Sequence, residues 1–254
     1  MMQCLFYKTL DDIKVRCQLC PHNCTIPNEE LGTCGVRYND SGKLVCHTSV
    51  SGLHTDPIEK KPLYHFYPGK QILSVGTYGC NLQCSFCQNH SISQYCAPKN
   101  KKPHLYNPVD IINRAFNQNN CIGIAFTYNE PTVWVEYMLE IAKLAKQNSL
   151  ANAMVTNGYI NPKPLDMILE FIDAFNIDLK GFSDKFYKEF TGGKLSPVLN
   201  TLKTIAKSGK HIEITYLVIP GLNDDETDFK KMAEWIASEL GPSIPLHINR
   251  YYPA

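Results

Sequence analysis

Short apolar segments alternate with longer amphipathic segments from residue 71 to the end of this 254-residue chain. The apolar segments predict six strands, at residues 71–76, 122–127, 151–156, 175–179, 212–219 and 246–251. The segments between them predict helices at residues 107–119, 131–147, 162–174, 183–190, 197–207 and 224–240, with a break at Gly192-Gly193. Alternation at this spacing indicates βαβ crossovers and a parallel sheet. The strands lack polar alternation, which is typical of strands that are buried on both faces.

This pattern fits both an open doubly wound sheet and a partial barrel, and periodicity alone does not choose between them. The composition is that of a globular protein, with 44% hydrophobic and 19% charged residues, so disorder is excluded as the main description. No apolar run approaches the ~18 residues of a membrane span. With 25 basic and 24 acidic residues, the chain has no bulk charge that would attract nucleic acid or anionic lipid. We therefore expect neither nucleic acid nor a membrane as a partner.

The first 70 residues differ from the rest because they are rich in Cys, Pro, Gly and His and show no long periodic segment. So small an apolar core needs a staple such as a metal. We expect a Cys-rich, metal-binding N-terminal extension and linker at residues 1–70, followed by an α/β domain at residues 71–254. The chain ends at Pro253-Ala254, directly after the sixth strand, and an uncovered edge strand favours aggregation. We therefore expect a C-terminally truncated chain or a missing partner segment.

Eleven cysteines are the unusual feature of the composition. Residues 1–8 do not show the basic and apolar regions of a signal peptide, so we expect a cytoplasmic protein in a reducing compartment. Clustered cysteines in such a chain bind metal or perform redox chemistry more often than they form disulfides. Seven of them fall into two groups in the first ninety residues, which places the metal chemistry there.

The decisive motif is Cys80-x3-Cys84-x2-Cys87, which follows the first strand of the alternating region. Three thiolates so close together can hold three corners of a [4Fe–4S] cluster and leave one iron open for a substrate or cofactor. A structural zinc site needs four ligands, and His90 could supply the fourth. Incidental clustering of three cysteines is the remaining alternative.

The spacing of these cysteines, the preceding strand and the aromatic residue Phe86 together resemble the radical S-adenosylmethionine (SAM) superfamily. The resemblance implies a partial (βα)6 barrel of the TIM type and a [4Fe–4S] cluster whose open iron binds SAM. Reductive cleavage of SAM would then give a 5′-deoxyadenosyl radical that abstracts hydrogen from a substrate. It also implies that Phe86 packs on the adenine, and it assigns no catalytic residue beyond the cluster ligands.

Further residues extend this resemblance to the ends of later strands. Tyr128-Asn129-Glu130 stands where the superfamily has Gly-Gly-Glu before a proline, a segment that receives the cofactor's ammonium group. Two Gly positions are replaced here, and Glu130 could equally be an acid at a helix N-terminus.

Asn157 ends the third strand, and Asp178 and Lys180 end the fourth. These positions resemble activases of glycyl radical enzymes, in which such an acid and lysine contact the carboxylate and ribose of the cofactor. Alternation places Asp178 and Lys180 on one face of a strand, so a plain ion pair is the structural alternative.

The amino-terminal motifs narrow the resemblance to one branch. The segments 17–24, 32–37 and 57–69, together with Cys87-Gln88-Asn89-His90, look like the radical SAM member of the AmmeMemoRadiSam system. This branch is related to pyruvate-formate-lyase activating enzymes. The resemblance implies a small-molecule or protein substrate, an external one-electron reductant such as flavodoxin or ferredoxin, and Memo-family proteins as partners. Members of the branch usually continue beyond the sixth strand.

The second group of cysteines is Cys17, Cys20, Cys24 and Cys34. Four sulfurs can close a site for zinc or for a second [4Fe–4S] cluster that is structural or relays electrons. His22 or Cys46 could replace one ligand.

Three classes of function remain in competition. A radical SAM enzyme is the leading hypothesis, with activation of a glycyl radical enzyme as one option within it. A non-catalytic iron–sulfur module for electron transfer or assembly is the second class, and a zinc-stabilised interaction domain is the third.

Overall fold

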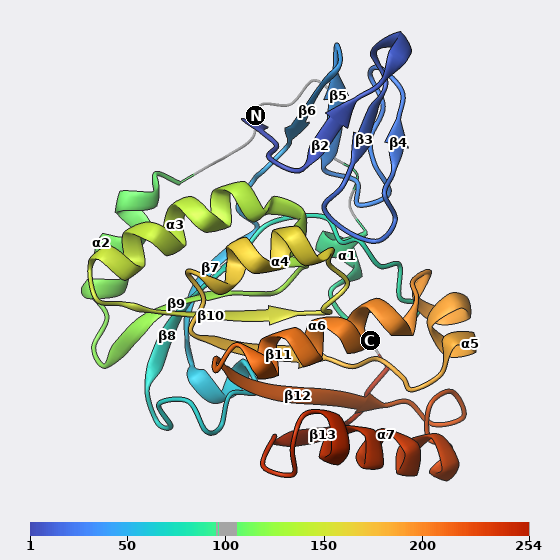
Figure 1. Cartoon of the computed structure of the whole chain (residues 1–254). Coiled ribbons are helices and arrows are strands. Elements are labelled where there is room, and N and C mark those ends of the chain that lie inside the picture. The colour runs from blue at the N-terminus through green and yellow to red at the C-terminus, as the bar shows by residue number, and fades with distance from the viewer. Residues whose placement is uncertain (95, 97–105, 254) are drawn as a thin grey trace.

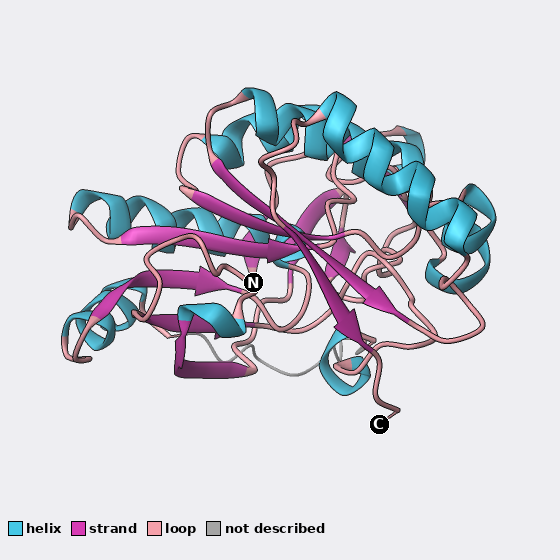
Figure 2. Cartoon of the chain, turned by 90° about the horizontal axis from the view of Figure 1, so that it is seen from below, coloured by secondary structure: helices cyan, strands magenta, loops and turns pink. Residues whose placement is uncertain are grey.

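The structure is a computed structural model that describes residues 1–94, 96 and 106–253. Ala254, the last residue of the sequence, lies outside the described residues. Seven strands form the main sheet in the order β13-β12-β11-β10-β9-β8-β7. The strands from β8 to β13 are parallel to their neighbours, whereas β7 is antiparallel to β8. The sheet is strongly curved, with helices along its outer side (Figure 2). The protein therefore has the α/β fold of a partial barrel of the TIM type.

All six expected strands are confirmed, each within about one residue of its expected bounds. They are β8 (Gln71–Gly76), β9 (Cys121–Phe126), β10 (Ala151–Thr156), β11 (Ala174–Asp178), β12 (His211–Val218) and β13 (Leu246–Arg250). Consecutive strands are neighbours in the sheet, so their carboxyl ends lie along one edge.

The longer helices between these strands pack on the outer face of the sheet (Figure 1). They are α2 (Pro108–Phe116), α3 (Val135–Gln147), α4 (Pro162–Leu169), α6 (Leu195–Lys207) and α7 (Glu226–Glu239). The shorter helical elements are α1 (His90–Ser93), η3 (Pro131–Trp134), α5 (Asp184–Phe186) and η4 (Tyr187–Thr191). The expected break between two helices is present, because the π-helical segment η4 ends at Gly192, whose φ of 71° is left-handed. Asn107 caps α2 by accepting a hydrogen bond from the Val109 amide, as expected for a helix that starts with proline.

The strand β7 (Gly52–Pro57) was not expected from the sequence, which shows no long periodic segment in its first 70 residues. It forms an antiparallel pair with β8, from Gly52 opposite Gly76 to Pro57 opposite Gln71. The short helix η2 (Ile58–Lys60) follows, and the chain then returns to β8 through an irregular connection at residues 61–70. The barrel sheet therefore includes residues 52–57 of the amino-terminal segment.

The remaining amino-terminal residues form two small antiparallel sheets with the orders β1-β6-β5 and β2-β3-β4. The elements are β1 (Met2–Gln3), β2 (Tyr7–Thr9), η1 (Asp11–Ile13), β3 (Val15–Cys17), β4 (Thr25–Ile26), β5 (Arg37–Asp40) and β6 (Lys43–Cys46). This part of the chain stands to one side of the barrel, above α3 and α4 in Figure 1.

One buried ion pair fixes the amino-terminal part to α3. Arg37, 1% exposed, donates hydrogen bonds from Nη2 to both carboxylate oxygens of Glu136 at 2.7 and 2.5 Å. Its Nε donates to the carbonyl oxygen of Val133 at 3.1 Å, and the Leu5 amide donates to Glu136 at 2.9 Å. These contacts hold β5 and the first residues of the chain against the barrel.

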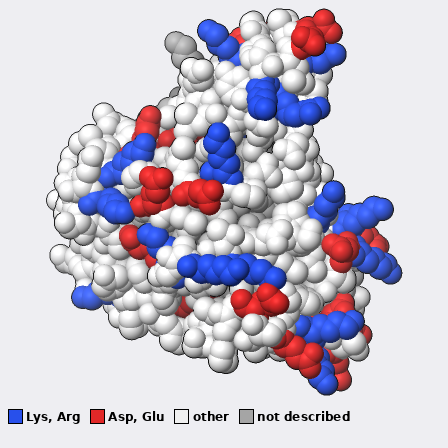
Figure 3. All heavy atoms as spheres, viewed as in Figure 1, with Lys and Arg blue, Asp and Glu red and all other residues white. Residues whose placement is uncertain are grey.

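Two features bear on possible partners, namely helices that could span a membrane and faces of one charge. Among the residues that the structure describes, no helix is both long and apolar enough to cross a membrane. Basic and acidic side chains are interspersed on the face that Figure 3 shows.

Candidate active site

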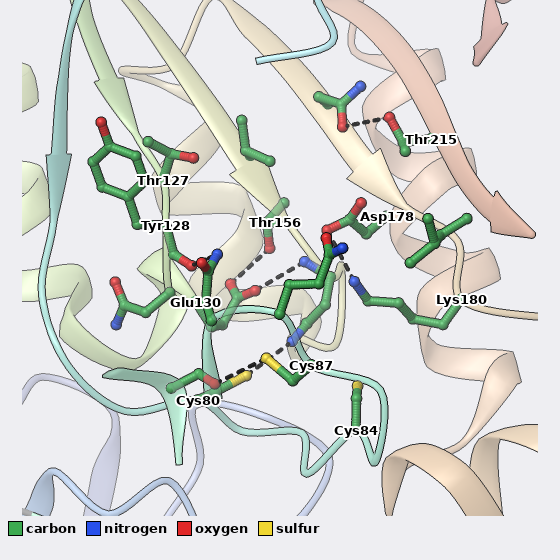
Figure 4. A pocket seen from close by; sticks show the side chains of 18 of the residues that line it. Cys80, Cys84, Cys87, Thr127, Tyr128, Glu130, Thr156, Asp178, Lys180 and Thr215 are labelled. Carbon is green, nitrogen blue, oxygen red and sulfur yellow. Dashed lines mark hydrogen bonds and ion pairs between the residues drawn. The ribbon is translucent and has the colours of Figure 1, made fainter. Parts of the chain in front are cut away.

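A pocket of about 370 Å³ opens at the carboxyl ends of the parallel strands. Active sites of barrels of this type lie at this end. All ten residues expected at the cofactor site line it: Cys80, Cys84, Phe86, Cys87, Tyr128, Asn129, Glu130, Asn157, Asp178 and Lys180. They come from one loop and the ends of three strands, and the labelled ones face a common space (Figure 4).

The three cysteines of the motif lie on the loop that follows β8. The Leu82 amide donates to Cys80 Sγ at 3.4 Å, and Cys87 Sγ lies 3.1 Å from Ser93 Oγ of α1. Burial raises the pKa of the Cys84 thiol to about 11, although the nearby Lys180 ammonium lowers it. A metal ion bound at this sulfur would have to displace the thiol proton.

Asparagine side chains fix this loop to the neighbouring strand ends. Asn129 Oδ1 accepts from the Thr77 amide at 2.9 Å, and its Nδ2 donates to the carbonyl oxygen of Gly79 at 2.9 Å. Asn81 Nδ2 donates to the carbonyl oxygen of Tyr159 at 2.6 Å, while its Oδ1 accepts from Asn157 Nδ2 at 2.9 Å. The side chain of Asn129 is thus directed at the loop, and Asn81 is a loop-positioning residue that the motif alone does not reveal.

Glu130 lines the pocket but is 3% exposed, and its carboxylate accepts four hydrogen bonds from the chain. Oε1 accepts from the Thr132 amide at 3.0 Å and from the hydroxyls of Thr132 and Thr156, both at 2.6 Å. Oε2 accepts from the Asn157 amide at 2.8 Å. Burial raises the pKa of Glu130 against these hydrogen bonds, which lower it. Glu130 therefore caps the helix η3, which is the structural role expected as the alternative to cofactor binding. It also joins the ends of β9 and β10 through Thr156 and Asn157.

Tyr128 occupies the first of the two positions where the resemblance places Gly, and its backbone conformation is one that favours Gly. Its φ is 73°, in the left-handed region that non-Gly residues rarely adopt. The Tyr128 hydroxyl donates to Asp56 Oδ2 at 2.9 Å, and Lys61 Nζ donates to the same oxygen at 2.9 Å. A Cβ at Gly76 would lie 2.7 Å from the Tyr128 ring, so the ring requires Gly there. Asp56 and Lys61 are neighbours of the site that sequence reasoning missed.

Asp178 and Lys180 form the ion pair that strand alternation predicts. Lys180 Nζ lies 3.0 Å from Asp178 Oδ2, and the two side chains are 20% and 32% exposed. Burial would lower the pKa of Lys180, but the Asp178 carboxylate and the Cys84 sulfur outweigh it and raise that pKa. The pair faces the pocket, and among the described residues Lys180 Nζ donates to the Asp178 carboxylate alone, which leaves donor capacity for a ligand.

The donor set at the three cysteines fits an iron–sulfur cluster better than a single zinc ion. Among the described residues that line this pocket, no fourth cysteine and no histidine is present. His90 is exposed, and its Nδ1 lies 3.2 Å from the carbonyl oxygen of Cys87.

The second group of cysteines also converges. Cys17, Cys20, Cys24 and Cys34 line one small pocket beside the cluster loop. Cys46 does not line it, since its sulfur contacts the carbonyl oxygen of Val133 and the hydroxyl of Thr48. Arg37 also lines this pocket, and its buried Nη1 has no hydrogen-bond partner among the described residues. A cluster of metal-bound thiolates, which is negative, would complement this guanidinium.

The two cysteine groups are close neighbours. A Cβ at Gly79 would lie 2.5 Å from the Cys34 carbonyl oxygen, so the amino-terminal extension packs directly on the cluster loop. His22 Nε2 lies 2.7 Å from the carbonyl oxygen of Asn81, which lines the second pocket as well. None of the four cysteines of the second group lines the larger pocket.

Comparison with known proteins agrees with this site. The family profile of the Radical SAM superfamily matches residues 74–236. An uncharacterized protein of Methanocaldococcus jannaschii is 43% identical over all of this chain and 75% of its own length. The pyruvate formate-lyase-activating enzyme of Clostridium pasteurianum is 26% identical over 68% of this chain and 75% of its own length.

A solved structure supports the fold. Streptococcus suis SuiB bound to S-adenosylmethionine aligns with a TM-score of 0.53 and 15% identity, over 70% of this chain and 39% of that one. The chain belongs to the radical SAM superfamily, as the matched residues show.

Proposed function

We propose that the protein is an enzyme that binds a [4Fe–4S] cluster at Cys80, Cys84 and Cys87 and cleaves SAM reductively at it. When bound, these groups supply a 5′-deoxyadenosyl radical that abstracts hydrogen from a substrate. The single observation that carries this proposal is the convergence of three thiols, with no fourth cysteine or histidine among the described lining residues, in the pocket at the barrel's carboxyl end. Three protein ligands leave one position free for the cofactor.

Different residues around this pocket would contact different parts of SAM. Phe86 is 8% exposed, lies beside Phe186 at 5.8 Å between ring centroids, and would pack on the adenine. Asp178 and Lys180 would contact the ribose and carboxylate, and Asn157 would contact the cofactor near Cys80, whose sulfur lies 3.7 Å from its Nδ2. Tyr128 and Asn129 would offer their backbone to the ammonium group. Glu130 would act there chiefly by holding the strand ends, because its oxygens already accept four hydrogen bonds.

Anaerobic reconstitution with iron and sulfide tests this function. The loaded protein, given SAM and a strong one-electron reductant, should form 5′-deoxyadenosine. Cluster assembly without cofactor binding or cleavage would instead indicate the non-catalytic electron-transfer or assembly module. Zinc without iron would indicate the interaction domain.

We expect Asp178→Ala and Lys180→Ala to weaken SAM binding by tenfold or more. The loss of a hydrogen bond to a charged group costs about 1.5–3 kcal/mol, and each 1.4 kcal/mol is a factor of ten. Anaerobic equilibrium binding to the cluster-loaded protein measures this effect. Lys185→Ala, on α5 outside the pocket, is the matched control. Unchanged affinity in both pocket variants, with a lowered melting temperature, would reduce the pair to a structural role.

Activation of a glycyl radical enzyme is the second candidate function. Relatives named as pyruvate formate-lyase activating enzymes favour it, as does a relative of Methanocaldococcus jannaschii, named as a putative glycyl-radical enzyme activating enzyme, at 25% identity. The substrate would then be a protein rather than a small molecule. An external one-electron reductant, such as flavodoxin or ferredoxin, belongs to either version. Memo-family partners are proposed from the sequence resemblance alone.

We further propose that the extension at residues 1–70 is a metal-binding unit of the barrel at 71–254, with β7 contributing to the barrel sheet. Its four cysteines would bind a second [4Fe–4S] cluster, with zinc as the alternative, because four sulfurs around one small pocket can close a site for either. Contact between the extension and the cluster loop at Gly79 and Asn81 supports a role in electron relay.

Iron analysis separates the metals at the second site. The variant with Cys17, Cys20, Cys24 and Cys34 all replaced by Ser should lose about half of the reconstituted iron. A matched Cys96→Ser variant, at an exposed position, should keep all of it. Retention of full iron with loss of one zinc equivalent would instead assign zinc to this site.

A further inference from the structure

Three histidines, His65, His211 and His247, surround the carboxylate of Glu213 on β12. Along β12, the residues Glu213 and Thr215 lie on the same face because side chains alternate along a strand. Thr215 lines the pocket, so Glu213 lies one step towards the amino end of the barrel. His247, on the edge strand β13, is the register partner of Thr215.

Glu213 is completely buried, and five nitrogen atoms approach its two oxygens. Oε1 lies 2.8 Å from the His65 amide nitrogen and 2.8 Å from His211 Nε2. Oε2 lies 3.1 Å from the Tyr64 amide nitrogen, 3.2 Å from His65 Nδ1 and 2.5 Å from His247 Nε2. Three of these five nitrogens belong to imidazole rings, so the carboxylate and the rings bring several potential metal-ligand atoms to one point.

The ligand geometry identifies the kind of cation. One ligand atom from each of His65, Glu213 and His247 lies within 4.8 Å of the other two. Two imidazoles and one carboxylate are a donor set for first-row divalent metals, as in catalytic zinc sites and non-haem iron sites. We propose that His65, Glu213 and His247 bind a divalent first-row transition-metal ion at this position. His211 would hold the other carboxylate oxygen and so orient the ligand.

Such an ion would join three segments that are separate in the sequence. His65 belongs to the connection that follows η2, Glu213 to β12 and His247 to β13. The same connection forms part of the pocket floor, because the Pro62 carbonyl oxygen accepts from Asn176 Nδ2 at 2.9 Å and both residues line the pocket. The ion would therefore fix the edge strand and the floor to each other. It would enter from solvent, since the His65 side chain is 61% exposed.

Zinc binding to the full chain tests this site. The protein is first loaded with iron and sulfide without oxygen, stripped of loosely bound metal, and titrated with Zn²⁺ against a chromophoric chelator. We expect the wild type to bind one equivalent that His65→Gln and His247→Gln lose or bind at least 100-fold more weakly. His54→Gln, at an exposed histidine of β7, is the matched control and should keep the equivalent. Bound Zn²⁺ should also raise the melting temperature of the wild type and of the control only.

The result does not depend on the enzymatic proposal, because no step of the test requires SAM. His65→Gln removes an exposed side chain, so it decides the question even if His247→Gln fails to fold. Equal zinc stoichiometry and affinity in the wild type and in His65→Gln would overturn the proposal. So would a wild-type protein that takes up no equivalent.

Discussion

Replacement of Cys80, Cys84 and Cys87 together by Ala is expected to abolish 5′-deoxyadenosine formation and to remove one [4Fe–4S] equivalent. These are the only cysteines that line the pocket among the described residues, so no other thiol there can take their place. Iron and sulfide content, together with product formation by the reconstituted protein, measure both effects. Iron at the second cysteine group should remain, because none of its ligands is changed.

The matched control for this variant is Cys121→Ala. Cys121 lies at the start of β9, at the opposite end of the strand from the pocket, and its sulfur contacts the carbonyl oxygen of Gly123. This variant should keep full iron and full activity. Circular dichroism of the triple variant checks that the barrel is still folded. Product formation by a folded triple variant would contradict the assignment of the cluster ligands.

The strands β8 and β9 could be predicted from the sequence because each one is a nearly unbroken apolar segment. In β8, five of the six residues are buried, which is the signature of a strand covered on both faces. The strand β7 carries no such signal, because only Leu53 and Asp56 of Gly52–Pro57 are buried. Its pairing with β8 depends on contacts that the local sequence does not encode.

The pocket could be predicted because parallel strands bring their carboxyl ends to one edge. The end of β9, the end of β10 and the end of β11 supply Glu130, Asn157 and the Asp178–Lys180 pair to the same space. Sequence reasoning could not find Asp56, which accepts from the Tyr128 hydroxyl, or Lys61, which donates to Asp56 and lines the pocket. It could not find the cluster around Glu213 either, because His65 lies 148 residues away along the chain.

The second large effect concerns stability: Arg37→Met is expected to lower the free energy of unfolding by about 3–5 kcal/mol. The substitution leaves Glu136, which is 5% exposed, as an unpaired buried charge. Chemical denaturation of the reconstituted protein measures the change. Lys231→Met, which removes an exposed ion pair with Asp228, should change it by no more than about 0.5 kcal/mol.

A double variant separates the buried charge from the lost packing. Arg37→Met with Glu136→Gln removes both charges and keeps an oxygen that accepts from the Leu5 amide. It should recover much of the stability that Arg37→Met loses, because replacing a whole buried pair costs less than breaking it. Equal loss in the single and double variants would show that the charge of Glu136 is not the cause.

The same substitution should also affect the metal sites, because Arg37 joins the amino-terminal extension to α3. An extension that detaches from the barrel withdraws the Cys34 carbonyl oxygen and His22 from the cluster loop, at Gly79 and Asn81. We therefore expect Arg37→Met to make residues 1–50 sensitive to limited proteolysis and to lose iron from both cysteine groups faster under a chelator. Stable iron in a variant whose extension is cleaved would show that the cluster loop keeps its shape without this support.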